Sequence, residues 1–230
     1  MSGAEPGALT GELVRLVGAA RVAACDPSPD FVTACRARYP GVDVRAGQAE
    51  ALDYADGQFD IAYAQLVFHF VSDPGRATAE MRRVVAPSGR VALCVWDFTV
   101  GMQMLRAFWD AALSLDPNAP GELGTFRFGR VNELSDLLTS AGLTDVQEEE
   151  LTVSSEYSDF DELWETFELG IGPAGAHVAR LAPEPRMALR EAYFRHLGSP
   201  VGSFHLTAVA RAAHGLVGRG RDQWAAPGEA

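Results

Sequence analysis

Residues 21–26 read Arg-Val-Ala-Ala-Cys-Asp, an apolar run that ends in an acid. Residues 8–17 precede this run with the apolar spacing of a short helix, and Gly7 stands in front of that helix. A glycine turn, a helix, a buried strand and a terminal acid form half of a nucleotide-binding unit, in which the carboxylate accepts hydrogen bonds from ribose hydroxyls. The sequence therefore predicts that Asp26 binds a ribose. The alternative is a solvated acid at the end of a strand.

Strands and helices alternate through the first half of the chain. The patterns predict strands over 21–25, 42–45, 59–65 and 90–97 and helices over 8–17, 29–39 and 73–85, the last helix ending before the turn at 87–89. Apolar strands that are separated by helices are typical of a parallel sheet whose two faces are both covered. We therefore expect an α/β fold with a doubly wound, mostly parallel sheet.

The second half is expected to be mainly helical. Its patterns predict helices over 101–115, 131–141, 159–169, 175–181 and 184–197, an extended segment over 143–155 and a final strand over 204–210. We expect one domain over residues 1–217, with its core in 1–100 and helical cap elements in about 101–130 and 159–197. Residues 218–230 are small and polar and are expected to be disordered.

Composition excludes several classes of function. The chain has 230 residues and a formal net charge of -12, so it has no basic surplus with which to release counterions from a nucleic acid. Its cysteines, Cys25, Cys35 and Cys94, lack the spacing of a zinc site or a disulfide framework. No apolar run reaches membrane-spanning length. We expect a soluble, cytoplasmic protein that binds no metal, nucleic acid or membrane.

Five short motifs follow one another in a fixed order. They are GALT at 7–10, DPS at 26–28, GQAEAL at 47–52, DGQFD at 56–60 and MRRVVAPSGRVALCV at 81–95. Together they resemble the class I S-adenosylmethionine-dependent methyltransferases, in particular the small-molecule branch called methyltransferase domain 11. Ser88 stands where that family commonly has glycine. The resemblance covers residues 1–97, and more loosely extends to about Gly215. It implies the Rossmann-like methyltransferase fold and methyl transfer from S-adenosyl-L-methionine to a small-molecule acceptor.

The resemblance also implies the cofactor contacts of the first motifs. Gly3 and Gly7 would lie in the turn beneath the methionine part of the cofactor, where a side chain would block the approach of the backbone. Asp26 would bind the ribose, with Pro27 beside it. These four residues form the expected contacts with the methionine and ribose parts of the cofactor.

Four later residues complete the expected cofactor site. The Gln48 amide and the Ala49 backbone N–H are candidate partners for the edge of adenine, and Glu50 flanks them. Gln65 ends the strand over 59–65, at the carboxyl edge where open α/β sheets bind ligands. For Gln48 and Glu50 the alternative is a solvated loop.

The N-terminus departs from the family pattern. The family's first motif reads acid-x-Gly-x-Gly-x-Gly after a buried strand, whereas residues 1–7 read MSGAEPG, with Met1 at the acid position and Glu5 at the middle glycine. No residues remain for that strand, and its absence would leave neighbouring strands uncovered and unpaired. Two hypotheses follow: an N-terminally truncated methyltransferase, or a degenerate binding or interaction module without catalysis.

The sequence offers few candidates for catalytic residues. His69 is the candidate general base because it follows the strand over 59–65 and titrates near neutrality. A core histidine that is hydrogen-bonded to the backbone is the favoured alternative. A nicotinamide-dependent oxidoreductase is the rival enzyme class, but it should show Gly-x-Gly-x-x-Gly, which Gly3, Gly7 and Gly11 do not supply.

Aromatic residues are dense in the second half of the chain. They are Trp96, Phe98, Phe108, Trp109, Phe126, Phe128, Trp164 and Phe167. One interpretation is an apolar lid over a small, largely apolar acceptor bound beneath the helices between Asp159 and Leu197. The other interpretation is ordinary helix-to-sheet core.

Overall fold

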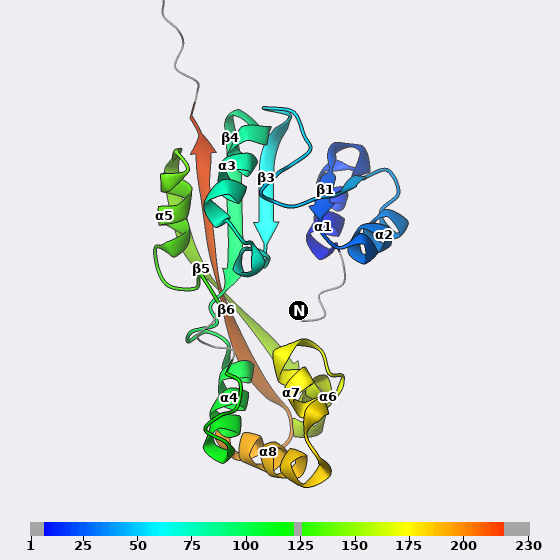
Figure 1. Ribbon diagram of the computed structural model, residues 1–230, viewed down its shortest axis with the longest axis vertical. Coiled ribbons are helices and arrows are strands. Elements are labelled where there is room, and N and C mark those ends of the chain that lie inside the picture. The colour runs from blue at the N-terminus through cyan, green and yellow to red at the C-terminus, as the bar shows by residue number, and fades with distance from the viewer. Residues whose placement is uncertain (1–6, 122–125, 219–230) are drawn as a thin grey trace, which may run out of the picture. The chain divides into compact units, whose positions relative to one another are not determined.

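The computed structural model describes residues 7–121 and 126–218 and divides the chain into two compact units (Figure 1). Of the described residues, 9–94, 131–149 and 212–218 belong to the sheet unit, and 7–8, 95–121, 126–130 and 150–211 belong to the helical unit. The expectation of one domain over residues 1–217 stays a prediction. Gly3, Glu5 and residues 219–230 of the expected tail lie outside the described residues.

The first part of the chain alternates helices and strands as predicted. Its elements are α1 (Ala8–Val17), β1 (Ala23–Asp26), α2 (Pro29–Arg38), β2 (Asp43–Ala46), β3 (Phe59–Gln65), α3 (Pro74–Val84) and β4 (Val85–Trp96), with short 3-10 turns η1 (Ala19–Arg21) and η2 (Phe68–Phe70). Local caps start two of the helices. The Ser28 side chain accepts a hydrogen bond from the backbone N–H of Phe31, Asp73 does the same for Arg76, and a proline follows each cap.

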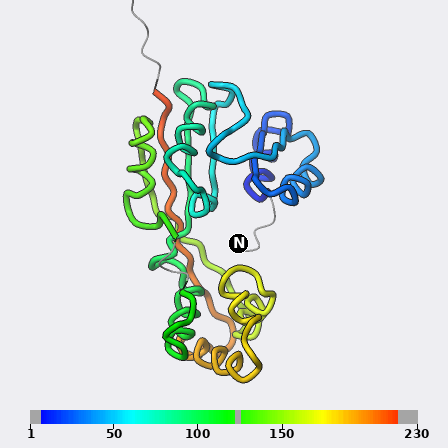
Figure 2. The backbone as a smooth tube through the Cα atoms, viewed as in Figure 1, coloured from blue at the N-terminus to red at the C-terminus, as the bar shows by residue number. Residues whose placement is uncertain are grey.

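The remaining elements are mainly helical, and their order can be followed along the tube in Figure 2. They are α4 (Gln103–Leu115), α5 (Glu133–Ser140), β5 (Leu143–Tyr157), α6 (Phe160–Glu168), α7 (Gly172–Arg180), α8 (Pro183–His196) and β6 (Phe204–Val217). The final strand is longer than the predicted 204–210. Within the described ranges, no helix combines the length and the apolar character that crossing a bilayer requires.

Two parallel strand pairs carry the motifs of the first half. β1 pairs with β2, with Asp26 opposite Ala46, and β3 pairs with β4, with Gln65 opposite Cys94. This confirms the α/β fold with parallel pairing. The strands form two sheets, however: β1-β2 is one, and the other has the order β3-β4-β6-β5. Among the described residues, β1 and β3 are therefore edge strands.

The prediction of strands buried on both faces is wrong for β3. Its side chains of Ile61 and Tyr63 are 42% and 46% exposed. Alternation along a strand places these two residues on the same face. β3 is an edge strand among the described residues, and the face that carries these two side chains is about half exposed.

The predicted turn at residues 87–89 lies inside a strand. β4 begins at Val85, not at Arg90, and its register against β3 shifts between the Phe59–Val85 pair and the Ile61–Arg90 pair. The extra residues of β4 form a bulge there, in which Ser88 has a left-handed φ of 68°. Glycine would adopt this conformation without strain, whereas the residue here is a serine.

Aromatic side chains form the core of the helical unit. Phe108 and Trp109 of α4 are 0% exposed, and the rings of Phe108 and Phe167 stack with centroids 4.5 Å apart. Tyr193 of α8 is also buried and donates a hydrogen bond from its hydroxyl to the backbone oxygen of Met104. Trp164 is buried with them, so these residues pack between helices, whereas the core interpretation placed them between helices and the sheet.

Candidate functional site

The Asp26 carboxylate is fixed by its own turn. Asp26 ends β1, and its Oδ1 accepts a hydrogen bond of 2.7 Å from the backbone N–H of Ser28. This bond orients the partly buried carboxylate where the chain leaves the sheet. No described residue donates a hydrogen bond to its Oδ2 in the same way. The group therefore keeps an acceptor oxygen for a ligand hydroxyl.

The neighbouring backbone is held close to Asp26. The N–H of Gly47 donates to the backbone oxygen of Asp26 at 3.1 Å, which joins the ends of β1 and β2. A Cβ on Gly47 would lie 3.1 Å from the Cys25 sulfur, so a side chain fits poorly there. Burial raises the pKa of the Cys25 thiol, which therefore stays protonated near neutral pH.

The three residues that the sequence places beside adenine differ in their surroundings. Gln48 is exposed and its backbone oxygen accepts from Ala51, while Ala49 is partly buried. Glu50 has structural partners: its Oε1 accepts from the backbone N–H groups of Ser72 and Asp73 at 3.0 and 3.2 Å. The Glu50 carboxylate thus ties the loop after β2 to the start of α3.

Arg83 of α3 anchors the same loop, and the sequence did not single it out. Its guanidinium donates to the backbone oxygens of Leu52 and Tyr54, each at 2.8 Å. It also pairs with Glu80, whose other oxygen accepts from the backbone N–H of Leu52. The hydrogen bond to Tyr54 joins residues that are 29 positions apart along the chain, so no local sequence pattern predicts this contact.

Tyr54 links the same loop to β1. Its hydroxyl donates to the backbone oxygen of Ala24 at 3.2 Å, and the Arg45 guanidinium lies 4.4 Å above its ring. Burial, together with the nearby Asp43 carboxylate, raises the pKa of Tyr54 to about 12. Tyr54 is therefore a neutral hydrogen-bond donor that positions the strand ending at Asp26.

The other two predicted residues, Gln65 and His69, lie at the end of β3 and on η2. Gln65 is exposed at the end of β3, and the following residue, Leu66, has a φ of 60° and donates its N–H to Cys94. His69 lies on η2, is only 8% exposed and meets the Phe70 ring edge-on at 6.2 Å. Its role as a base stays a prediction.

The glycine turn is described only in part. Gly7 directly precedes α1 and has a left-handed φ of 86°, a conformation that favours glycine. Gly3 lies outside the described residues. Pro27 is exposed beside Asp26. The described residues contain no cluster of three or more His, Cys, Asp or Glu side chains that could hold a metal ion.

The sequence around this site is similar to known methyltransferases. The sequence profile described as a methyltransferase domain matches residues 2–93, which include β1, β2, β3 and the residues around Asp26. This match lies in the first part of the chain, and it agrees with the resemblance of the motifs there to class I methyltransferases. An uncharacterized methyltransferase of Mycobacterium tuberculosis is 37% identical over 95 residues, which are 41% of this chain and 37% of that protein. The chain spans only 28–37% of the length of the first curated relatives that it matches.

Solved structures share the methyltransferase fold. A protein of Anabaena variabilis, assigned as a methyltransferase of an antibiotic biosynthesis pathway, superposes with a TM-score of 0.59 at 19% identity, covering 93% of this chain and 87% of that one. A phosphoethanolamine N-methyltransferase of Haemonchus contortus, solved with phosphomonomethylethanolamine and S-adenosylhomocysteine, has a TM-score of 0.55 at 11% identity and covers 94% of this chain and 48% of that one. The chain therefore shares the fold of these methyltransferases.

Proposed function

We propose that this chain transfers a methyl group from S-adenosyl-L-methionine to a small-molecule acceptor. The observation that carries the proposal is the Asp26 carboxylate, which ends a parallel strand, is oriented by Ser28 and keeps one oxygen available for a ribose. It lies within the segment that matches the methyltransferase domain. A structural relative that was solved with S-adenosylhomocysteine supports the choice of cofactor.

The surrounding residues suit the parts of this cofactor. Gly7 presents backbone without a side chain in front of α1, and exposed Gln48 offers a donor and an acceptor to the edge of adenine. Glu50 and Arg83 keep the loop of Gln48 in place. When it is bound, the cofactor supplies an electrophilic methyl group. The protein's contribution is to align the acceptor with that group, since alignment supplies much of the rate.

The role of Asp26 can be tested with two matched variants. Asp26→Ala removes both the charge and the acceptor for the Ser28 N–H, whereas Asp26→Asn keeps an oxygen for Ser28 and removes the charge. We expect Asp26→Ala to weaken S-adenosylhomocysteine binding in calorimetry by about 1.5–3 kcal/mol, the range for hydrogen bonds to a charged group. Asp26→Asn should lose a smaller share. Wild-type affinity in a folded Asp26→Ala variant would rule out ribose binding by Asp26.

A degenerate binding module is the second candidate, and the divided sheet favours it. β1 and β3 are both edge strands among the described residues, and β3 exposes Ile61 and Tyr63. We propose that cofactor affinity depends on a further strand that pairs with these edges and steadies the glycine turn. The test compares S-adenosylhomocysteine binding by the 230-residue chain with binding by a version that carries an added N-terminal strand.

Each outcome of this comparison is informative. Stronger binding by the extended version supports the dependence on an added strand. Low-micromolar binding and turnover by the 230-residue chain would show that no further strand is needed. Failure of both versions would favour the non-catalytic module over the methyltransferase.

The acceptor is proposed to be small, largely apolar and held by the helices between Asp159 and Leu197. The net charge of -12 disfavours polyanionic acceptors, and α7 in this range lines a cavity beside Trp109.

If His69 acts as a general base, His69→Gln should reduce kcat without changing the affinity for S-adenosylhomocysteine. An equal loss of cofactor affinity would indicate a structural histidine.

A further inference from the structure

Two segments of the sheet unit meet at Glu50. One is the cofactor loop, residues 47–52, in which Gln48 and Ala49 are the predicted neighbours of adenine. The other is the base segment, residues 66–73, which carries His69 and leads from β3 into α3. Both segments belong to residues 9–94 of the sheet unit, so the contacts between them are made inside one compact unit.

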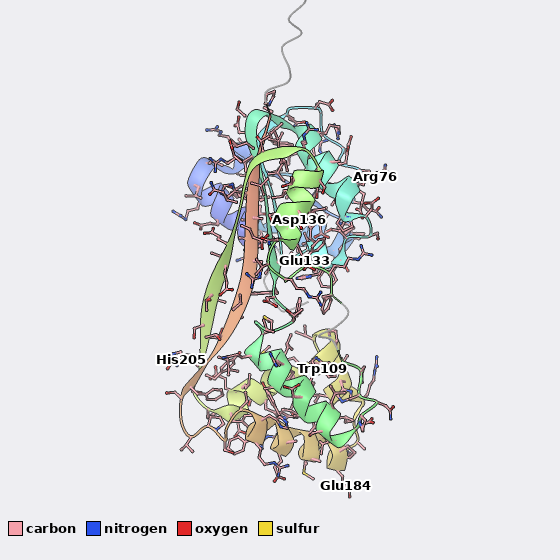
Figure 3. All side chains as sticks on the ribbon, turned by 90° about the vertical axis from the view of Figure 1, so that its left-hand side faces the viewer. Arg76, Trp109, Glu133, Asp136, Glu184 and His205 are labelled. Carbon is pink, nitrogen blue, oxygen red and sulfur yellow. The ribbon has the colours of Figure 1, made fainter. Side chains whose placement is uncertain are left out.

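Glu50 binds the start of α3 through its side chain and through its backbone. Its Oε1 accepts hydrogen bonds from the backbone N–H groups of Ser72 and Asp73, at 3.0 and 3.2 Å. Its backbone oxygen accepts a hydrogen bond of 2.9 Å from the guanidinium of Arg76, which Figure 3 labels on α3. Hydrogen bonds to a carboxylate are stronger than those between neutral groups. Glu50 therefore joins the cofactor loop to the end of the base segment.

The position of Ser72 and Asp73 makes these bonds important for the base segment. Asp73 is the N-cap of α3, and its side chain accepts a hydrogen bond from the backbone N–H of Arg76 at 3.0 Å. N–H groups at the start of a helix have no helical carbonyl to bind and need another acceptor. Glu50 supplies that acceptor from 22 residues before Ser72 in the chain. Loss of its carboxylate would loosen the place where the base segment enters α3.

The two residues predicted beside adenine form a short link between two anchors. On one side of them, the N–H of Gly47 binds the backbone oxygen of Asp26 at 3.1 Å. On the other side, Glu50 is bound to α3. A ligand that shifts or steadies residues 48 and 49 therefore acts directly on Glu50, because no other residue lies between them and this anchor.

The same helix also holds the far end of the cofactor loop. Glu80 Oε2 accepts a hydrogen bond of 2.9 Å from the N–H of Leu52, and Arg83 donates one of 2.8 Å to the oxygen of Leu52. Arg76, Glu80 and Arg83 recur at the spacing of one helix face. The loop is thus fastened along α3, which limits the ways in which Glu50 can move independently of the helix.

We propose that Glu50 couples the cofactor loop to the base segment, so that a ligand bound at Gln48 and Ala49 orders residues 66–73. In this role Glu50 is a positioning residue, which acts on the segment of His69 through the backbone of Ser72 and Asp73. The coupling is reciprocal, because a contact that steadies one segment steadies the other by the same free energy. The inference rests on the proposed function only for the identity of the ligand.

The test follows backbone hydrogen exchange by NMR in the 230-residue chain, with and without saturating S-adenosylhomocysteine. In the wild type, the ligand should slow exchange of the Ser72 and Asp73 N–H groups about fivefold, the lower end of typical couplings between sites. Glu50→Ala removes the carboxylate and should abolish this slowing. Glu50→Gln keeps an oxygen that can accept the same bonds and should retain part of it.

Glu148→Ala is the matched control. The Glu148 carboxylate accepts hydrogen bonds from the backbone N–H groups of Asn132 and Ser135, each at 2.9 Å, at the start of α5. It is the same kind of bridge on another helix. Glu148→Ala should leave the effect of the ligand on Ser72 unchanged. A purely structural Glu50 would give faster exchange at Ser72 in Glu50→Ala, but with the same fold-change on adding ligand.

Two outcomes with bound ligand would overturn the inference: no slowing at Ser72 and Asp73 in the wild type, or full slowing in Glu50→Ala. Calorimetry on the same samples measures binding of S-adenosylhomocysteine, so the proposed function is judged separately. If the ligand does not bind, the coupling is measured in the free protein. Asp73→Ala removes the cap of α3 and should speed exchange of the Ala51 N–H, which binds the oxygen of Gln48. Adding Glu50→Ala should remove this response, and an unresponsive Ala51 would overturn the inference.

Discussion

Gly89 illustrates how a single residue limits the sequence of this fold. It lies in the bulge of β4, where a Cβ would approach the backbone oxygen of Asp60 to 2.4 Å and the backbone oxygen of Ala86 to 2.9 Å. Backbone atoms on two sides cannot move away as the end of a long side chain can. The sequence marks this glycine as part of a turn, but only the pairing of β3 with β4 shows the close approach.

Gly89→Ala should therefore destabilise the protein. Overpacking typically lowers the free energy of unfolding by about 1–3 kcal/mol, and we expect a value at the upper end. Gly218→Ala is the matched control, because a Cβ there meets no atom within 4 Å. Urea denaturation followed by circular dichroism measures both variants. Equal midpoints would contradict the packing seen around Gly89.

Asp97 and Arg211 form a buried pair at the end of β4. The Asp97 side chain is 2% exposed and lies 3.5 Å from the Arg211 guanidinium, which also contacts half-exposed Glu150. Burial raises the pKa of Asp97, but hydrogen bonds from Thr99 and Val100 and the charge of Arg211 outweigh it, so the pKa is lowered. Its stabilising effect is present above the ordinary carboxyl pKa and is lost as the pH falls through the lowered value.

Arg211→Met should lower the free energy of unfolding by about 3–5 kcal/mol, because it leaves the buried Asp97 carboxylate without its cation. Glu150→Gln removes only a partly exposed partner and should cost less than about 1 kcal/mol. Chemical denaturation near neutral pH compares the two variants. The Asp97–Arg211 pair would be unimportant for stability if both variants lost equally little.

At the scale of elements, β3 is the strand whose surroundings differ most from the prediction. Its sequence reads as buried, yet Ile61 and Tyr63 are about half exposed. The neighbouring β4 alternates in the expected way, with Val91, Leu93 and Val95 almost fully buried. Two strands with similar apolar sequences thus differ in burial, because the burial of a strand depends on which segments pack against it.

Substitutions on these two strands should differ in effect. Ile61→Thr on β3 is expected to change the free energy of unfolding by less than about 1 kcal/mol, as for a surface position. Leu93→Ala on β4 should lower it by about 2–5 kcal/mol, the range for truncating a buried leucine. Thermal and urea denaturation provide the measurement. A large loss in Ile61→Thr would mean that another part of the protein covers this face in solution.

At the scale of the whole molecule, the main property that the sequence predicts is the net negative charge. Thirty-one acidic residues outweigh nineteen basic ones, for a formal net charge of -12. Because long-range repulsion adds over all residues, this property needs no structure to predict.

Nucleic acid should consequently not bind this protein. We expect no change in the fluorescence anisotropy of labelled RNA or DNA when the chain is added at low salt, where counterion release would be most favourable. A free fluorophore serves as the control for non-specific sticking. A saturable signal that weakens with added salt would contradict the exclusion and favour a nucleic-acid acceptor.

The candidate site was predictable in part. Asp26 at the end of β1 follows from periodicity and spacing, and its local hydrogen bond to Ser28 spans only two residues. Glu50 looked like a cofactor residue or a solvated acid, but its partners Ser72 and Asp73 lie on the approach to α3. Arg83 carried no local signal. Partners so distant along the chain become neighbours only after the helices have packed.

The sequence alone predicted the alternation of strands and helices, the acid that ends β1 and the net negative charge that disfavours polyanionic partners. Each of these depends on local conformation, on periodicity or on a sum of charges. Only the tertiary structure decided that the strands are divided between β1-β2 and β3-β4-β6-β5, that Glu50 and Arg83 anchor a loop, and that Asp97 pairs with Arg211. These features depend on which distant segments pack together, because burial and hydrogen bonding are properties of neighbours in space.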